Sequence, residues 1–451
     1  MMKFNNQNGK DLLATLATQL WKLISGPITM LFIPIFLSPE QQGYWYLFGS
    51  ISALSIFADL GFSNIILQFS AHEYAYLHFN EKRLLEGDVN HLNKLGSFFG
   101  FTLKWISTIS VIVFPIIFIV GLYFFYRDGV LAVYLLPWFL YSIGSLLNFF
   151  NGSILSFIEG LNKIEEVQKI RFKVALINTS IIVLILLLRG NIYALAISIL
   201  FSSSFIFISI FGKFKPFLFQ LLELSKKIKY SWRKEVLPLF MKYALSFSSG
   251  YFIFQIYTPL MHYFHGPILS GKVGISISLV TAIFNISNIW MYTITPQINM
   301  FVSKQEWKSL DAVFNKRLWL SLGTYLFIGI CVIVFLMIFG DFWIVPKVVD
   351  RFLTFKSIII LYLCYFIQLI INSFALYLRG HKKEPFMIIS IISAIWIAVV
   401  TIIVGKFLPS DYFFFGFFSM QIIGLPICYM IFNICKKKWH IYNSEENNQS
   451  E

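Results

Sequence analysis

The sequence is poor in charged residues and cysteine, and each scarcity excludes classes of protein. Charged residues make up 13% of the 451 residues, against about 25% in ordinary soluble domains. The four cysteines lie in or beside apolar segments without ligand-like spacing, so they indicate neither a disulfide framework nor a metal cluster. Hydrophobic residues make up 57% of the chain and the mean hydropathy is +0.73. This composition excludes a soluble enzyme and a disordered chain, and it predicts a membrane protein.

Motifs for catalysis and for cofactor binding are also missing. The sequence has no catalytic triad and no pair of carboxylates at a polar site. Residues 266–273 nearly match a phosphate-binding loop, but the final Ser or Thr that binds Mg²⁺ and a preceding strand are absent. His72, Glu73 and His78 lie at an expected helix end without matching ligands elsewhere. We therefore expect no catalytic residues, no metal and no cofactor, and the protein is predicted not to be an enzyme.

Apolar runs long enough to cross a bilayer recur along the chain. A helix needs about 20 apolar residues to cross the hydrocarbon core. The predicted crossings lie near 12–37, 44–70, 96–121, 130–158, 170–188, 192–212, 236–261, 273–299, 317–339, 353–378, 385–405 and 412–434. The predicted fold class is all-α: a polytopic membrane protein with 12 transmembrane helices in two six-helix lobes around a central cavity.

The distribution of basic residues predicts how these helices are oriented. The chain has 36 Lys and Arg against 22 Asp and Glu, a net charge of +14. With a cytoplasmic N-terminus, the inner loops and tails hold 26 of the 36 basic residues and the outer loops hold seven. Because cytoplasmic loops carry an excess of Lys and Arg, both termini are predicted to be cytoplasmic. The first apolar run has no cleavage site after it and is expected to be a retained helix.

A polar segment at 213–235 divides the chain into two halves. The predicted organisation is an N-lobe at 1–212, a cytoplasmic linker at 213–235, a C-lobe at 236–435 and a cytoplasmic tail at 436–451. Two interpretations of the basic residues in the linker stay open. The linker is an amphipathic segment that lies on the anionic inner leaflet, or its basic residues only reflect the general excess of positive charge in cytoplasmic loops. Gly160 and Gly380 end the fourth and tenth crossings, each before a basic turn, which indicates a repeat. Halves of equal orientation are related by an axis along the membrane normal, which predicts a central cavity and alternating access.

Four ionisable residues inside crossings are candidate functional residues, because a charge in the bilayer is costly unless it meets water or a partner. Lys22, Asp59, Lys104 and Lys242 lie in the first, second, third and seventh crossings. Lys104 and Lys242 are each placed where the ammonium group could instead reach the membrane surface. Lys22 could instead pair with Asp59 and join two helices. In the functional interpretation, Lys22 and Lys242 attract an anion across the cavity, and Asp59 acts as a gating or proton-accepting group.

Side-chain amides accompany these charged residues in the predicted crossings. A cavity that handles sugars needs many such groups, because each hydroxyl stripped of water needs a replacement partner. The alternative role for any single amide is interhelical hydrogen bonding, worth about 0.6 kcal/mol on average. The candidate substrate-binding residues are Lys22, Asp59, Asn64, Gln68, Lys242, Gln255, Asn288 and Gln297.

Motifs in the first 160 residues resemble those of a known family. They are Gly43-Tyr44-Trp45-Tyr46-Leu47-Phe48, Ala58-Asp59-Leu60-Gly61-Phe62-Ser63-Asn64, Gln68-Phe69-Ser70-Ala71-His72-Glu73 and Glu159-Gly160. The sequence is similar to the O-antigen flippases (Wzx-type) and polysaccharide transporters of the multidrug, oligosaccharidyl-lipid and polysaccharide exporter superfamily. The resemblance implies translocation of undecaprenyl-pyrophosphate-linked oligosaccharide across the bacterial inner membrane through a cationic cavity, onto which Lys22 and Lys242 map.

The expected partners follow from this resemblance, and two alternatives stay open. The expected partners are the lipid-linked oligosaccharide and membrane lipids. Further candidates are H⁺ or Na⁺ and a polysaccharide polymerase, because an ion gradient or consumption of the product outside would make transport proceed in one direction. No nucleic acid is expected. A multidrug antiporter of the same superfamily would need acidic groups for cationic drugs, and Asp59 is the one convincing acid deep in a crossing. A membrane-embedded polymerase or acyltransferase would need larger outer loops than this chain has.

Overall fold

The fold is that of a computed structural model, which describes residues 2–227, 230–339, 345–381 and 383–448. The described residues are almost entirely helical. The chain divides into two compact units, Met1–Tyr251 and Phe252–Glu451, here called unit 1 and unit 2.

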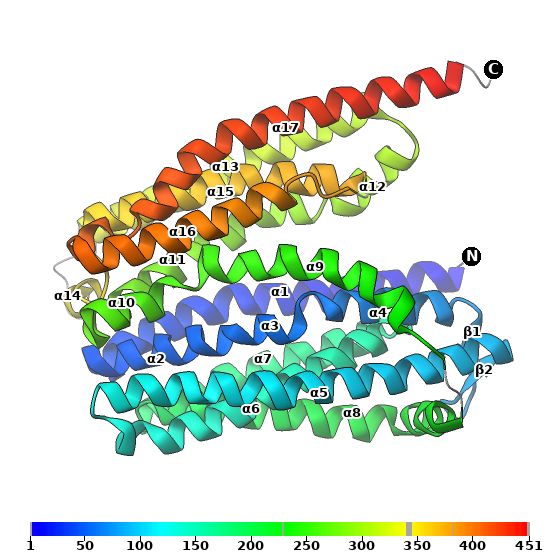
Figure 1. The fold of residues 1–451 in the computed structure, drawn as a ribbon, viewed down its shortest axis with the longest axis horizontal. Coiled ribbons are helices and arrows are strands. Elements are labelled where there is room, and N and C mark those ends of the chain that lie inside the picture. Colours follow the sequence, from blue (N-terminus) through cyan, green and yellow to red (C-terminus); the bar gives the residue numbers. More distant parts are fainter. Residues whose placement is uncertain (1, 228–229, 340–344, 382, 449–451) are drawn as a thin grey trace. The chain divides into compact units, whose positions relative to one another are not determined.

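Unit 1 consists of long helices, one interrupted helix and a small β-hairpin (Figure 1). Its elements are α1 (Met2–Phe36), α2 (Pro39–Ser52), η1 (Ala53–Ser55), α3 (Ile56–Asp59), α4 (Phe62–Tyr74), β1 (Leu77–Phe79), β2 (Leu85–Gly87), α5 (Val89–Arg127), α6 (Leu131–Gly160), α7 (Ile164–Leu187), α8 (Tyr193–Lys227) and α9 (Arg233–Phe254), which belongs to unit 1 up to Tyr251.

Every regular element among the described residues of unit 2 is a helix. Its elements are α10 (Tyr257–His265), α11 (Pro267–Tyr292), α12 (Thr295–Ser303), α13 (Trp307–Phe339), α14 (Val345–Val349), α15 (Phe355–Gly380), α16 (Met387–Phe407), η2 (Ser410–Tyr412) and α17 (Phe415–Asn448). The boundary between the units lies within α9, whereas the sequence places the lobe boundary at the 213–235 segment. The assignment of helices to lobes therefore stays a prediction.

The helices confirm a polytopic membrane protein. Among the described residues, ten helices are long and apolar enough to cross a membrane, or up to 11 if one bent pair is counted as a single span. That pair covers the predicted crossing 44–70, which is bent by 43° between Asp59 and Phe62 rather than continuous. The predicted crossing 236–261 is also interrupted, because α9 ends at Phe254 and α10 begins at Tyr257. The count of 12 crossings and the cytoplasmic side of the termini stay predictions.

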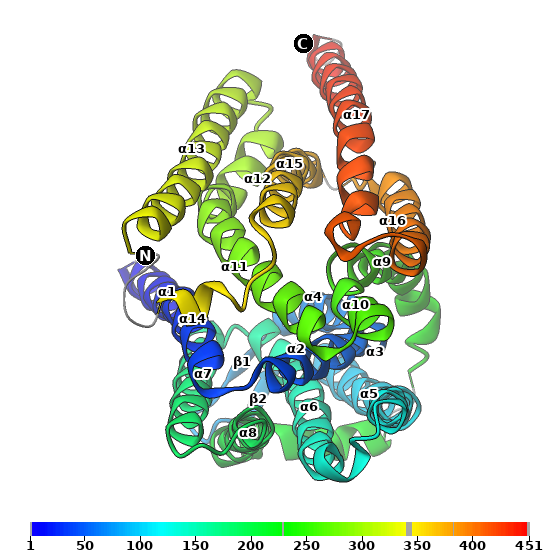
Figure 2. The same cartoon turned by 90° about the vertical axis from the view of Figure 1, so that its left-hand side faces the viewer.

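Unit 1 packs aromatic and aliphatic side chains between its helices and exposes other apolar side chains on its outside. Helices α6 and α8 lie side by side, as do α1 and α7 (Figures 1 and 2). Phe48, Phe125 and Trp138 are fully buried and pack against one another, with ring centroids 4.8–5.9 Å apart. On α5, by contrast, Val111 and Ile119 are exposed. An apolar outer surface is expected where lipid is the solvent, because unpaired polar side chains are costly in hydrocarbon.

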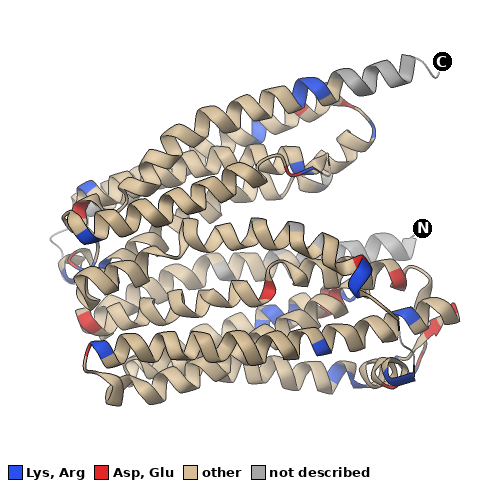
Figure 3. Cartoon of the chain, in the orientation of Figure 1, with Lys and Arg blue, Asp and Glu red and all other residues tan. Residues whose placement is uncertain are grey.

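At each end of unit 1, contacts join loops that were predicted to lie on the same side of the membrane. Most charged residues of unit 1 lie toward the helix ends (Figure 3). At one end, the Lys213 ammonium lies 2.9 Å from the Glu166 carboxylate, and the Lys163 ammonium lies over the Phe79 ring. These residues come from three segments that were all predicted to be cytoplasmic. At the opposite end, the Tyr44 hydroxyl donates to the Asp128 carboxylate at 2.9 Å and joins two predicted outer segments.

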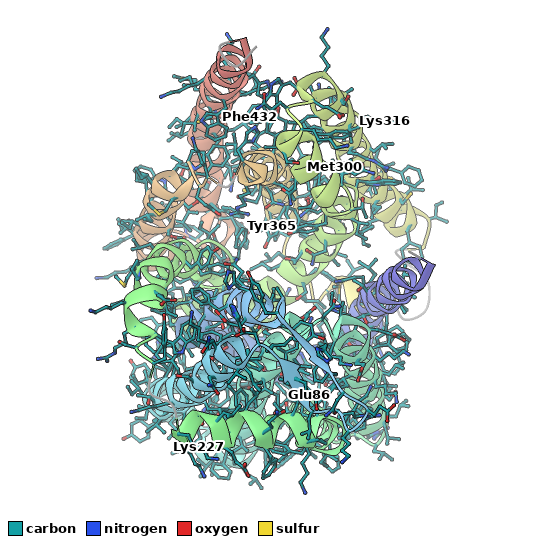
Figure 4. All side chains as sticks on the ribbon, turned by 90° about the vertical axis from the view of Figure 1, so that its right-hand side faces the viewer. Glu86, Lys227, Met300, Lys316, Tyr365 and Phe432 are labelled. Carbon is teal, nitrogen blue, oxygen red and sulfur yellow. The ribbon has the colours of Figure 1, made fainter. Side chains whose placement is uncertain are left out.

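The β-hairpin was not predicted from the sequence. Strands β1 and β2 are antiparallel, with His78 opposite Glu86 (Glu86 is labelled in Figure 4). The amide of Gln220 on α8 bonds both to the N–H of Leu85 and to its carbonyl oxygen, each at 2.9 Å. The hairpin is thereby fastened to the end of α8. A two-stranded hairpin is marginal by itself, so this contact explains why it is ordered.

The last turns of α8 are amphipathic and lie across the end of unit 1 (Figure 4, where Lys227 is labelled). Phe214, Phe217 and Leu221 are buried, whereas Lys226 and Lys227 are exposed. The first part of the predicted linker is therefore a continuation of α8 as far as Lys227. Its position on a lipid surface stays a prediction.

In unit 2, too, contacts join loops that were predicted to lie on the same side, and its helices pack around aromatic side chains. At one end the Leu353 N–H donates to the Ser276 hydroxyl at 3.1 Å, and at the other the Tyr377 hydroxyl donates to Asp311 at 2.8 Å. The Phe374 and Phe432 rings stack with centroids 4.5 Å apart (Phe432 is labelled in Figure 4). Helices α15 and α17 are held together by this stack.

The two glycines that indicated a repeat make equivalent contacts in their own units. Gly160 lies so close to α4 that a Cβ atom would stand 1.9 Å from the Ser70 hydroxyl oxygen and 2.7 Å from the Leu67 carbonyl oxygen. A Cβ at Gly380 would stand 2.6 Å from Ile298 on α12. The fourth predicted crossing therefore packs on the end of the second, and the tenth packs on the end of the eighth. This correspondence supports the repeat with a contact that the sequence did not show.

Candidate functional site

The break in the second predicted crossing is built by Asp59, Leu60 and Gly61. Leu60 and Gly61 adopt left-handed backbone conformations, with φ of 43° and 80°, which end α3 before α4 begins. The Asp59 carboxylate accepts hydrogen bonds from the Gly61 N–H at 3.2 Å and from the Ser63 N–H at 3.1 Å. It also accepts one from the Ser63 hydroxyl. An anion at a helix N-terminus is stabilised by the free N–H groups and the helix dipole, so Asp59 holds the break in place.

Gly61 is required at this break for a second reason. A Cβ atom at Gly61 would stand 2.9 Å from the Phe247 ring and 3.0 Å from the Tyr243 Cβ, both on α9. The positive φ of Gly61 also disfavours any residue with a side chain. Helix α9 therefore lies directly against the break, and the glycine makes room for it.

A polar cavity of about 310 Å³ lies beside the break, wholly within unit 1. Its wall combines the broken helix with α6 and one residue of α8. The lining residues are Ser52, Ala53, Ser55, Ile56, Asp59, Ser63, Ser145, Asn148, Phe149, Gly152, Ser153 and Ile199. A concave site with a few convergent polar groups is the usual form of a small-ligand site.

The hydroxyl groups of the cavity differ in how far they are already engaged. The Ser52 hydroxyl donates to that of Ser145 at 3.0 Å. The Ser153 hydroxyl donates to the Phe149 carbonyl oxygen at 3.2 Å. Within the described part of the chain, no hydrogen bond is found for the Ser55 hydroxyl. The cavity therefore keeps polar groups available to a ligand.

Several residues of this cavity could have been found from the sequence. Ser145, Asn148, Gly152 and Ser153 recur at the spacing of one helical face. This polar face within an apolar helix is the signal that the search for charges and amides passed over. Asn148 is one of the amides in the predicted crossings, but it was not among the candidate site residues.

The other predicted unit 1 residues whose side chains are described do not line the cavity. Asn64 and Gln68 are exposed on α4, and neither lines the cavity. The Gln68 amide lies 3.4 Å from the Tyr243 hydroxyl, to which it donates. Lys22 lies in α1 and Lys242 in α9, but their side chains are outside the described residues. The predicted ion pair of Lys22 and Asp59 is therefore not tested, and Lys104 is exposed on α5.

The predicted residues of unit 2 differ in how far they are buried. Gln255 and Gln297 are exposed. Asn288 is completely buried in α11, and among the described residues neither its amide oxygen nor its nitrogen has a partner. The Gln421 amide donates to Gln368 at 2.8 Å and joins α15 to α17. This last contact is the interhelical role that the sequence left open for the amides.

Metal and cofactor sites were also sought among the charged and thiol groups. Within the residues that the structure describes, no group of three or more His, Cys, Asp or Glu side chains could hold a metal ion. The motif residue Glu159 instead forms an ion pair with Arg171, with 2.8 Å between nitrogen and oxygen, and accepts from the Gln168 amide at 3.2 Å. Glu159 therefore joins the end of α6 to the start of α7.

Comparison with known proteins identifies the fold. No protein-family model matches the sequence, and no curated protein is similar to it. An inward-facing structure of a multidrug resistance MATE family transporter of the MOP superfamily has a TM-score of 0.62 and 13% identity, covering 93% of this chain and 96% of that one. A MOP superfamily transporter from Pyrococcus furiosus has a TM-score of 0.56 and 12% identity, covering 96% of each chain. A mutant MATE transporter of Vibrio cholerae has a TM-score of 0.53 and 11% identity, covering 98% of this chain and 100% of that one.

These similarities extend over nearly the whole chain, although the sequence identity is low. The chain therefore has the fold of MATE transporters of the MOP superfamily. This is the superfamily to which the sequence resemblance pointed. The similarity shows the fold and leaves the substrate to be argued from the residues.

Proposed function

We propose that this protein is a transporter that carries undecaprenyl-pyrophosphate-linked oligosaccharide from the inner to the outer leaflet of the bacterial inner membrane. The fold supports transport by alternating access, since it is the fold of known membrane transporters. The motifs around Asp59 and Glu159 support the polysaccharide branch. Sugars and pyrophosphate cannot cross hydrocarbon, whereas the polyprenyl tail remains in it.

The state of Asp59 is the observation that carries the choice of an anionic substrate. A multidrug antiporter needs a carboxylate that is free to meet a cationic drug. The Asp59 carboxylate accepts three hydrogen bonds from its own helix break, two of them from the backbone. Its charge is thereby compensated by the helix N-terminus, so it offers little attraction to a cation. Inside the predicted crossings, Lys22 and Lys242 accompany this one carboxylate, which favours an anion.

One solved structure of the same fold indicates that the polarity of the binding site can change. The Pyrococcus furiosus transporter is described as having a reverse polarity of its binding pocket, which suggests a different function for it. A fold that accommodates pockets of opposite polarity can carry anionic head groups in this chain. In this proposal Lys22 and Lys242 supply the positive charge for the pyrophosphate group.

Mass spectrometry of lipid-linked oligosaccharides in a strain that lacks this protein tests the proposal. We expect a complete undecaprenyl-linked repeat unit to accumulate while the surface polysaccharide disappears. Complementation with Lys22→Ala together with Lys242→Ala should leave this defect, whereas Lys104→Ala, which removes an exposed lysine, should correct it. If the strain that lacks the protein becomes sensitive to cationic drugs and accumulates no lipid-linked repeat unit, the protein is a multidrug antiporter instead. Repeat units that reach the outside and stay unpolymerised would identify a polymerase.

A further inference from the structure

We propose that the cavity beside Asp59 binds one sugar ring of the transported oligosaccharide. This inference rests on the proposed function and adds to it the place where the sugar is recognised. The cavity lies within unit 1 and is lined by six serine or asparagine side chains together with the Asp59 carboxylate. A sugar that leaves water needs a new partner for each of its hydroxyl groups, and hydroxyl, amide and carboxylate groups supply such partners.

The size of the cavity fits a single ring. Its volume of about 310 Å³ corresponds to roughly ten water molecules at about 30 Å³ each. Ligand pockets range over about 300–1,000 Å³, so the cavity lies at the lower end. A whole repeat unit with its pyrophosphate is too large for it. One ring can enter while the rest of the head group stays outside.

The free hydrogen-bonding groups match a polyhydroxylated ligand. A carboxylate has about four acceptor positions, and three of those of Asp59 are used by Gly61 and Ser63. The remaining position, on Oδ2, can accept from a sugar hydroxyl. Within the described residues, Asn148 and Ser55 also line the cavity without a protein hydrogen bond. The Asn148 amide both donates and accepts, so it can meet a hydroxyl in either sense.

Phe149 adds an aromatic residue to the wall of the cavity, beside these polar groups. A sugar ring has an apolar face of C–H groups as well as its hydroxyls. Binding pockets commonly combine aromatic walls with a few placed polar groups that fix orientation. Phe149 and Asn148 both line the cavity, so it offers apolar and polar groups to one ligand.

A metal cation fits this cavity less well than a sugar does. Hard cations such as Ca²⁺ take six to eight oxygen ligands, usually with several carboxylates. The cavity has one carboxylate, and both of its oxygens already accept hydrogen bonds. The other lining groups are neutral. A neutral ligand with many hydroxyl groups therefore suits the site better.

Binding of two lipids to the purified full-length protein in detergent tests the inference. One probe is undecaprenyl pyrophosphate, and the other is the same lipid with its oligosaccharide repeat unit. Asn148→Leu keeps the side-chain size and removes the amide, and Ser55→Ala removes the hydroxyl. We expect each variant to bind the glycosylated lipid about tenfold more weakly, the loss that follows when one buried hydroxyl has no partner. Binding of the bare lipid should not change.

Controls separate this inference from the proposed function. Ser107→Leu replaces an exposed serine of α5 and should change neither affinity. If Asn148→Leu fails to fold, Asn148→Ala provides the same comparison. Unchanged binding of the glycosylated lipid by both the Asn148 and Ser55 variants would overturn the sugar site. An equal loss of affinity for both lipids in these variants would also overturn it. So would a loss of affinity in the variants that is seen only when Na⁺ is present, because the cavity would then bind a cation. Failure of the wild-type protein to bind either lipid would refute the proposed function itself.

Discussion

The close contact at Gly160 makes a quantitative prediction about stability. In Gly160→Ala the new Cβ would stand 1.9 Å from the Ser70 hydroxyl oxygen and 2.7 Å from the Leu67 carbonyl oxygen. The Ser70 hydroxyl cannot turn away freely, because it donates to the Ile66 carbonyl oxygen at 2.7 Å. Helices α4 and α6 must therefore separate. Overpacking of this kind costs about 1–3 kcal/mol, and we expect the melting temperature of the purified protein to fall by a few degrees.

The size of the effect can be divided by a second substitution. Ser70→Ala removes the nearer of the two contacts and leaves the one to the Leu67 carbonyl oxygen. In the Gly160→Ala background it should restore about half of the loss, a coupling of about 0.5–1.5 kcal/mol between neighbouring residues. Thermal unfolding in detergent, followed by tryptophan fluorescence, measures all four proteins of the cycle.

A matched glycine provides the control. Gly212 lies inside α8 and a Cβ there would meet nothing within 4 Å. Gly212→Ala should therefore stabilise the protein by about 0.5–1 kcal/mol, because alanine loses less conformational entropy in a helix. If Gly160→Ala melts like the wild type, or if Ser70→Ala restores nothing, the packing of α6 on α4 is wrong.

Three further predictions concern the helix ends. Gln220→Ala removes both bonds to Leu85, so hydrogen exchange should rise in residues 77–87 and stay unchanged in α6; unchanged exchange in the hairpin would contradict the role of Gln220. Arg171→Ala leaves the half-buried Glu159 carboxylate without its cation, which should cost about 1–2 kcal/mol in thermal unfolding, with Arg171→Lys restoring part of it. Burial lowers the pKa of His381 to about 4 from 6.5, so the unfolded chain takes up a proton first as the pH falls. Stability should therefore be lost between about pH 6.5 and pH 4, and His381→Gln should reduce that slope; an equal slope in both proteins would contradict the burial of His381.

The fold was largely predictable because lipid imposes one requirement on every crossing. Long apolar runs such as 96–121 and 170–188 fall within α5 and nearly within α7. Backbone groups in hydrocarbon must bond within their own helix, so hydropathy alone locates such elements. The charge distribution predicted the inner and outer loops, and contacts such as Lys213 with Glu166 join loops predicted to lie on the same side. Which side is cytoplasmic stays a prediction.

Interruptions of the helices were harder to predict, since they depend on a few residues. The break at Leu60 and Gly61 lies in a run that remains apolar, so hydropathy continues through it. Its sequence signal is Asp59 followed by Gly61 and Ser63. The Asp59 carboxylate caps the new helix by accepting from the N–H groups of these two residues. The hairpin at 77–87 depends on Gln220, which is more than 130 residues away in the sequence.

Of the residues that line the candidate site, only the charged one was predicted. Asp59 was identified because a carboxylate in a crossing is costly. The serines and Phe149 were not, because a small hydroxyl or an aromatic ring is common in any membrane helix. The face that α6 turns toward the broken helix decides which of these residues line the cavity. The local sequence of α6 does not show which face that is. Asn288 was chosen as a substrate-binding residue, whereas the structure buries it inside unit 2.

Leaflet exchange in reconstituted vesicles tests the central claim most directly. Purified protein is placed in vesicles that contain the undecaprenyl-pyrophosphate-linked repeat unit in both leaflets, and a membrane-impermeant glycosidase is added outside. The account predicts that vesicles with the protein expose the lipid of the inner leaflet as well, so that nearly all of the oligosaccharide is cleaved. Vesicles without protein, and those with Lys22→Ala and Lys242→Ala together, should lose only the outer-leaflet share. Cleavage limited to the outer leaflet in the presence of the wild-type protein would contradict the account.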